Sequence, residues 1–158
     1  MILVRGWTFD HIGLVVKSLP KANAILSGTL GIADWTEPLR DAVNGVHLQF
    51  GRDAAGMVYE LLQPIDSTSP VYSALSGGKA IINHVAYLVD DLASGAEHLC
   101  HLDSVATSDP KPAIAYGGAR IQFFVTPLRF VIELIEAPRH THVYGLTSDV
   151  ANSMRGLI

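Results

Sequence analysis

Two histidine–glutamate pairs stand at the same spacing in the two halves of the chain. Glu60 follows His11 after 49 residues, and Glu133 follows His84 after 49 residues. Each glutamate lies inside an apolar run, where a buried carboxylate is costly unless it is paired or coordinated. Two neutral imidazole nitrogens and two carboxylate oxygens suit a divalent ion of Zn, Ni, Co, Fe or Mn, without selecting one of them. The pattern therefore predicts one shared metal site, provided that the fold brings the two pairs together.

The pairs belong to an internal repeat with an offset of 73 residues. The matching segments are Asp10–Leu19 with Asn83–Leu92, Gly45–Phe50 with Gly118–Phe123, and Tyr59–Gln63 with Ile132–Glu136. All three matches keep one register without a gap, which favours a single module built twice. A histidine at a strand start is commonly a hydrogen-bonded core residue, and a strand glutamate commonly faces solvent. The recurrence of both at one spacing favours the metal site over that alternative.

Each half has the pattern of a βαβββ module, which predicts an α+β fold. We expect Pro20 in the first turn of one helix, Gly31 at its end, and Asp90 or Asp91 as the N-cap of the other. The strands are expected at 9–16, 32–37, 46–50 and 57–63, and again at 82–89, 104–108, 119–125 and 130–135. The chain is expected to form one domain, 1–158, with module one at about 8–64, a linker at about 65–80 that begins a short helix near Ser69–Pro70, module two at about 81–137 and a tail at 138–158.

At these residues the chain resembles the vicinal oxygen chelate superfamily, which includes glyoxalases, bleomycin resistance proteins and dioxygenases. The resemblance covers about residues 8–137 and is nearest to the methylmalonyl-CoA epimerase branch. It rests on the motifs Asp10–Val16, Tyr59–Pro64 followed by Ser69–Val71, Ile82–Leu92, Gly117–Ile121 and Ile132–Glu136. It implies two tandem modules that form a curved, barrel-like mixed sheet around a metal cleft. It also implies that His11, Glu60, His84 and Glu133 ligate the metal, and that the protein is a homodimer.

The function implied by the resemblance is that of a divalent-metal-dependent isomerase or epimerase acting through an enolate. Its substrate would be a small acyl-CoA or 2-oxo acid derivative, with methylmalonyl-CoA as the nominal one, and Glu133 would act as an acid/base. The epimerases place a second carboxylate on the third strand of module one, where this chain has no Asp or Glu. His47 is the substitute on that strand, because an imidazole is suited to proton transfer near neutral pH; alternatively it only lines the sheet.

Three further polar residues are candidates for binding substrate. Gln49 and Gln122 occupy equivalent positions in the repeat, and Arg120 lies on the same strand face as Gln122. The glutamines would offer hydrogen bonds to a substrate or support a metal ligand, and the arginine would pair with a carboxylate or phosphate. The alternative for the arginine is a solvated surface position.

Two other functions remain open at this level. A glyoxalase-type lactoylglutathione lyase would use the same four ligands, and a binding protein of this fold would hold an antibiotic or metabolite without chemistry. Retention of all four ligand types favours an enzyme.

The composition narrows the remaining possibilities. The 158 residues are 16% charged, with a net charge of −4 and no basic stripe, which argues against nucleic acid as a partner. No apolar run is long enough for a signal peptide or a bilayer span, so no membrane partner is expected. The single cysteine excludes an internal disulfide and suits the cytoplasm. We therefore expect a cytoplasmic protein that acts on a small-molecule substrate.

Overall fold

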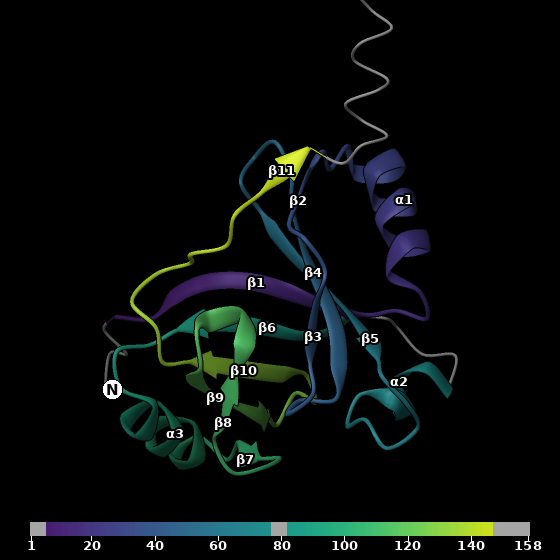
Figure 1. Ribbon diagram of the computed structural model, residues 1–158. Helices are drawn as coiled ribbons and strands as arrows, with labels where there is room; N and C mark the ends of the chain where they lie inside the picture. The colour runs from purple at the N-terminus through teal and green to yellow at the C-terminus, as the bar shows by residue number, and fades with distance from the viewer. Residues whose placement is uncertain (1–5, 77–81, 147–158) are drawn as a thin grey trace, which may run out of the picture.

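The computed structural model describes residues 6–76 and 82–146 (Figure 1). One mixed sheet runs through these residues in the order β11-β2-β4-β5-β1-β6-β10-β9-β7, with β3 paired to β4 and β8 paired to β9. The sheet is curved, and its path ends at β11 and β7 without closing within the described ranges. The fold is therefore the expected α+β arrangement around a central cleft.

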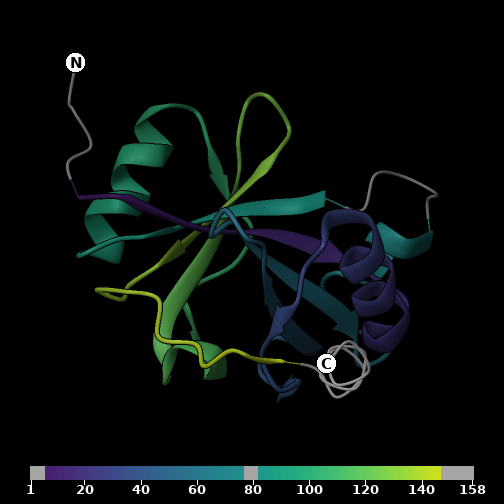
Figure 2. The same cartoon turned by 90° about the horizontal axis from the view of Figure 1, so that it is seen from above.

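The two halves of the sheet repeat one another. Module one consists of β1 (Thr8–Val15), α1 (Leu19–Leu30), β2 (Asp34–Trp35), β3 (Leu39–Asp41), β4 (Val46–Arg52) and β5 (Val58–Pro64). Module two consists of β6 (Ile82–Leu88), α3 (Leu92–His101), β7 (Val105–Ala106), β8 (Lys111–Ala113), the 3₁₀ turn η1 (Ile114–Tyr116), β9 (Ala119–Val125) and β10 (Val131–Ile135). The first strand of each module is parallel to the last strand of the same module, and β1 and β6 pair antiparallel at the centre. Helices α1 and α3 consequently lie at opposite ends of the molecule (Figure 2).

Local sequence explains where both helices begin and end. Ser18 accepts a hydrogen bond from the Lys21 amide and Pro20 lies in the first turn, while Gly31 ends α1 in the left-handed conformation at φ 66°. Asp91 caps α3 by accepting from the Ser94 amide at 2.7 Å. These positions agree with the sequence expectations.

A second pair of contacts, also 73 residues apart, ties each helix to its own module. The Leu19 amide donates to Gln63 Oε1 at 2.9 Å, and the Leu92 amide donates to Glu136 Oε1 at 3.1 Å. The last strand of each module thus supplies an acceptor for the first amide of its helix, which carries no intrahelical bond.

Strand alternation separates two faces of the sheet. On the inner face, side chains of both modules share one core, which includes Val46, Leu48, Phe50, Leu62, Ile121 and Ile135. On the outer face, Leu14, Leu61 and Trp35 pack in a cluster with α1, and Leu99, Phe124 and Leu134 form the corresponding cluster at α3. A polar residue on a strand therefore faces either the shared cleft or a helix, depending on its parity.

Several elements were not expected from the sequence. The short strands β3 and β8, the turn η1 and the terminal strand β11 (Gly145–Leu146) are additional, and β2 and β7 are shorter than expected. The linker contains the expected short helix, α2 (Tyr72–Ser76). The end of the linker, 77–81, and the tail beyond 146 lie outside the described residues. Among the described helices, none has the length and apolarity needed to cross a membrane.

Candidate metal centre

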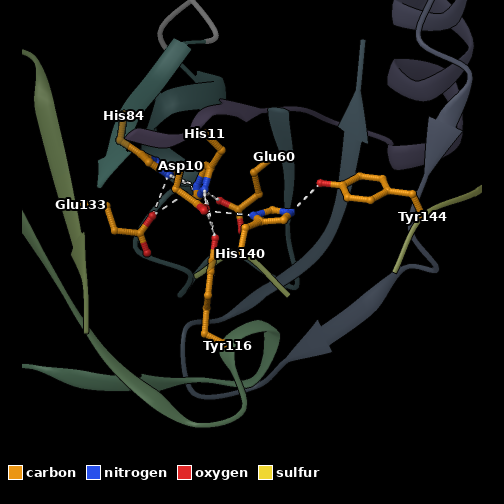
Figure 3. A network of polar contacts seen from close by, with 8 residues as sticks. All are labelled: Asp10, His11, Glu60, His84, Tyr116, Glu133, His140 and Tyr144. Atoms are coloured by element: carbon orange, nitrogen blue, oxygen red, sulfur yellow. Dashed lines mark hydrogen bonds and ion pairs between the residues drawn. The ribbon is translucent and has the colours of Figure 1, made fainter. Parts of the chain in front are cut away.

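His11, Glu60, His84 and Glu133 converge on the inner face of the sheet, and we call them the His/Glu cluster. They come from β1, β5, β6 and β10, the central strands on which the two modules meet. In the register, His84 stands opposite Gly13 and His11 stands opposite Ala86, so both imidazoles project from one face. The four residues are between 0% and 6% exposed. Figure 3 shows their side chains pointing toward one another.

The donor atoms of the cluster are closely spaced. His11 Nε2 lies 3.1 Å from His84 Nε2, 3.1 Å from Glu60 Oε2 and 3.3 Å from Glu133 Oε2. His84 Nε2 lies 3.4 Å from Glu60 Oε2 and 3.0 Å from Glu133 Oε2. Two ligands that share a zinc-like ion at roughly 2.0–2.1 Å are about 2.9–3.4 Å apart at cis or tetrahedral angles. The spacing therefore fits a common divalent ion.

The neighbours of the two histidines set the direction of their lone pairs. Nδ1 of His11 lies 2.8 Å from Asp10 Oδ2, and Nδ1 of His84 lies 2.9 Å from Asn83 Oδ1. Both partner oxygens are acceptors, so each Nδ1 carries the hydrogen and each Nε2 presents a lone pair to the cluster. This support from behind is what histidine ligands of metals commonly receive.

The charges inside the cluster favour a bound cation. Burial alone would lower the pKa of His11, but the charge of Glu60, the contacts with Asp10 and Glu60, and the nearby Glu133 carboxylate raise that pKa well above its usual value. Burial would raise the pKa of Glu60, but His11 and His84 lower it to about 2. Without an ion, the carboxylates would thus draw a proton onto the imidazoles. A divalent ion would supply the same compensation.

Two further observations fit a metal ion. Glu133 Oε2 is buried and has no hydrogen-bond partner. The two histidine Nε2 atoms are close to it, but each of them presents a lone pair and therefore donates no hydrogen. A Cβ added to Gly13 would lie 2.1 Å from His84 Cε1, so the absence of a side chain at Gly13 makes room for this imidazole. Coordination of a metal ion would explain both the unpartnered oxygen of Glu133 and the space that Gly13 leaves for His84.

Alanine at Gly13 should displace His84 from the cluster. The added methyl group overpacks a buried site, which costs about 1–3 kcal/mol, and it moves Nε2 away from the shared centre. We expect weaker Zn²⁺ binding in a chelator competition and a lower midpoint of urea unfolding. The matched control is Gly28→Ala in α1, where no atom lies within 4 Å and alanine should stabilise by about 0.5–1 kcal/mol. Equal metal affinity in Gly13→Ala and wild type would contradict this role of Gly13.

The structure does not bring the other expected site residues to this cluster. His47 stands opposite Gln63 on the outer face, while the neighbouring Leu48 and Phe50 face the cleft. Gln49 also points outward, where its Nε2 donates to the Thr36 carbonyl at 2.8 Å and its Oε1 accepts from Asn23. Because His47 and Gln49 lie on the outer face of β4, they do not face the cleft in which catalysis or substrate contact was expected.

The second module shows the same arrangement. Gln122 faces outward with Leu134 and donates to the Ser108 carbonyl at 2.9 Å. Arg120 forms a two-pronged ion pair with the Glu136 carboxylate at 2.8–2.9 Å, and its side chain is 56% exposed. Arg120 thus occupies the surface position that was its alternative in the sequence analysis. The side chains of Arg120 and Gln122 both make their contacts on the outer face of module two.

Several polar residues beside the cluster were missed by sequence reasoning. Asp10 is buried behind His11, and Tyr116 from η1 donates its hydroxyl hydrogen to Asp10 (Figure 3). Burial and the charges of Asp10, Glu133 and Glu60 raise the pKa of Tyr116 well above its ordinary value, so the phenol keeps its hydrogen. Asp41 is also buried and accepts from the Ile114 amide and from Asn44. An aspartate directly before the first histidine was the available signal for Asp10; Tyr116 and Asp41 carried none.

A cavity leads from the cluster toward one side of the sheet. A small hollow of about 40 Å³ is bounded by Glu60, Glu133, Asp41 and Tyr116. It adjoins a cavity of about 430 Å³, since Val46, Leu62, Ile121 and Phe123 line both. The larger cavity also has polar lining residues, among them Asn44, Asn83 and Lys111. A hollow of about 420 Å³ beneath α1 touches none of the cluster residues. A substrate-sized space thus adjoins the His/Glu cluster from the inner face.

Comparisons with known proteins agree with this architecture. A family model described as Glyoxalase/Bleomycin resistance protein/Dioxygenase superfamily matches residues 10–123. No curated protein matches the sequence significantly. Among solved structures, a hypothetical protein from Bacillus halodurans C-125 is similar with a TM-score of 0.71 and 21% identity, over 87% of this chain and 99% of that one.

Methylmalonyl-CoA epimerases are also among the similar structures. The enzyme from Mycobacterium tuberculosis has a TM-score of 0.70 and 20% identity, over 96% of this chain and 97% of its own. A variant of the Streptomyces coelicolor epimerase in complex with 2-nitronate-propionyl-CoA has a TM-score of 0.66 and 21% identity, over 83% of this chain and 97% of its own. At such identities the likeness establishes the fold alone.

Proposed function

Because the chain belongs to the glyoxalase/bleomycin resistance protein/dioxygenase superfamily, we propose that it is a divalent-metal-dependent isomerase or epimerase. Its reaction is the removal and return of a proton on the carbon next to a substrate carbonyl. The observation that carries this proposal is the buried convergence of two imidazole lone pairs and two carboxylates at 3.0–3.4 Å. Without an ion, the two carboxylates would be compensated only by protons on the imidazoles, which would remove the lone pairs that face the cluster.

In the proposed site, His11, Glu60, His84 and Glu133 hold the ion. A bound divalent ion supplies Lewis-acid polarisation of the substrate carbonyl, which acidifies the adjacent C–H bond. Glu133 borders both the cluster and the small hollow, so its carboxylate reaches the space where the substrate lies. It takes the proton as general base and returns it as general acid.

Epimerisation also needs a proton donor on the opposite face of the carbon. Asp41 borders the same hollow from module one, and hydrogen bonds from Asn44 and the Ile114 amide hold its carboxylate in place. We assign the second proton position to Asp41, in place of His47 on the outer face. Removal and return of the α-proton on the same face of the carbon would need Glu133 alone.

The cavity supports a small acyl thioester as the substrate class. Its walls of valine, leucine, isoleucine and phenylalanine suit an acyl chain, and Lys111, Asn44 and Asn83 offer polar contacts, including one to an anion. The similar epimerase in complex with 2-nitronate-propionyl-CoA supports an acyl-CoA, with methylmalonyl-CoA as the first compound to test. We also propose a homodimer, which the exposed apolar side chains of Ile25, Ile82, Val105 and Leu128 support. A cytoplasmic location is proposed because the single cysteine suits a reducing compartment.

Solvent-deuterium exchange tests the proposed reaction. Metal-loaded protein should incorporate deuterium at the α-carbon of methylmalonyl-CoA or a related thioester in ²H₂O, and chelator-treated protein should not. Mass spectrometry of the recovered thioester measures the incorporation. The hemithioacetal of glutathione and methylglyoxal is tested in parallel, because its turnover would indicate the alternative function of a lactoylglutathione lyase. Saturable binding of a compound without exchange in any of them would contradict an enzyme and favour a binding protein.

A further inference from the structure

The segment that follows module two returns to module one. Residues 139–146 run from the end of β10 across the molecule to β11, which pairs with β2 through Gly145 opposite Trp35 (Figures 1 and 2). Tyr144 is held there by the Arg52 guanidinium, whose carbon lies 4.4 Å from the ring centroid. The segment lies outside the internal repeat, so module one provides no counterpart of it.

This segment joins the His/Glu cluster through Asp10. His140 Nδ1 lies 3.0 Å from Asp10 Oδ1, and Asp10 Oδ2 lies 2.8 Å from His11 Nδ1. His140 Nε2 lies 2.7 Å from the Tyr144 hydroxyl. Since the carboxylate can only accept, His140 donates from Nδ1 and its Nε2 accepts from Tyr144. The result is a continuous chain from Tyr144 through His140 and Asp10 to His11 (Figure 3).

The two histidines of the cluster are therefore supported unequally. Asn83 takes the place of Asp10 behind His84, with a neutral amide oxygen as the acceptor, and it borders the open cavity. On the side of His11, His142 stacks on Phe50 with ring centroids 3.9 Å apart. Phe123, the counterpart of Phe50, lines the open cavity instead. The returning segment thus covers one half of a nearly symmetric site and leaves the other half open.

We propose that His140 is a positioning residue of the metal centre, which acts on the ion through Asp10 and His11. Its hydrogen bond holds one oxygen of Asp10, so that the other oxygen stays directed at His11 Nδ1. That contact keeps the hydrogen on Nδ1, orients the ring and leaves the Nε2 lone pair directed at the cluster. The inference rests on the proposed metal site and needs no particular substrate.

Metal affinity tests the role of His140. We expect His140→Ala to bind Zn²⁺ about 5- to 10-fold more weakly than wild type in competition with a chromophoric chelator, less than the 10–100-fold that loss of a direct partner costs. His140→Asn should restore most of the affinity, because its Nδ2–H group stands at the position of the histidine Nδ1–H. The control is His101→Ala, which removes an exposed histidine of α3 and should bind Zn²⁺ like wild type. Co²⁺ absorption spectra should shift in His140→Ala alone.

The outcomes separate this inference from the proposed function. Wild-type affinity in His140→Ala would overturn it while leaving the metal centre intact. Equal losses in the Ala and Asn variants, matched by equal losses of apo-protein thermal stability, would assign His140 a merely structural role and overturn it as well. Metal binding without any α-proton exchange would count against the proposed reaction but not against the role of His140. Failure of wild type to bind any of the tested metals would overturn both.

Discussion

Glutamine at Glu133 should reduce α-proton exchange by about 10²–10⁴-fold, the contribution of a positioned general acid/base. Glutamine keeps the size of the side chain and one oxygen that can still ligate, but its amide cannot take the proton. We therefore expect a folded variant that retains bound metal and loses turnover. Deuterium incorporation under saturating substrate, with metal content measured on the same sample, provides the test.

The matched control for this variant lies three residues along the chain. Glu136→Gln changes the same functional group on the outer face, where the carboxylate pairs with Arg120 and accepts from the Leu92 amide. A glutamine oxygen can still accept from that amide, so exchange should stay near the wild-type rate. A fully active Glu133→Gln protein would contradict the acid/base assignment of Glu133.

Alanine at either histidine of the cluster should abolish stoichiometric metal binding. The purified wild-type protein is expected to carry about one divalent ion per chain, because four donors converge on one centre. His11→Ala and His84→Ala each remove a donor contributed by a different module, so equal losses in both variants would establish that the two modules share one site. Elemental mass spectrometry of the three proteins measures the metal content.

Reconstitution completes this comparison. Each protein is loaded with Co²⁺, Ni²⁺, Zn²⁺ or Mn²⁺ and then desalted, and His101→Ala again serves as the control for simple loss of a histidine. Metal retained in both cluster variants would place the binding site elsewhere. A wild-type protein that stays metal-free under all four conditions would direct the search to ligands of an unmetallated cleft.

The repeat explains why much of this site was predictable from sequence. An offset of 73 aligned His11 with His84 and Glu60 with Glu133, and the structure places all four on the central strands within one cluster. Helix ends were predictable for a local reason, since Ser18, Gly31 and Asp91 act through backbone groups a few residues away. Strand parity correctly grouped His47 with Gln49, and Arg120 with Gln122, on common faces.

Parity alone does not say which face is the inner one. That choice follows from the register of β4 on β5, which sets Phe50 beside Glu60 and His47 beside Gln63. Register is a pairing of distant segments, and a shift by one residue would exchange the two faces of a strand. The expected acid/base role of His47 and the expected substrate contacts of Gln49, Arg120 and Gln122 depended on this choice. The helices occupy the face on which these residues lie.

The sequence by itself determined the two-module fold, its helix caps and the four residues of the His/Glu cluster, because periodicity, capping and an exact repeat are local or self-referring properties. Only the tertiary structure decided what surrounds the cluster. Tyr116 reaches Asp10 across 106 residues and His140 reaches it across 130. Neither Tyr116 nor His140 has an equivalent residue in module one, so the spacing of residues in the sequence does not predict these contacts. They arise because the cleft between the modules collects side chains from η1 and from the returning segment, and this is where the two halves of the protein cease to be equivalent.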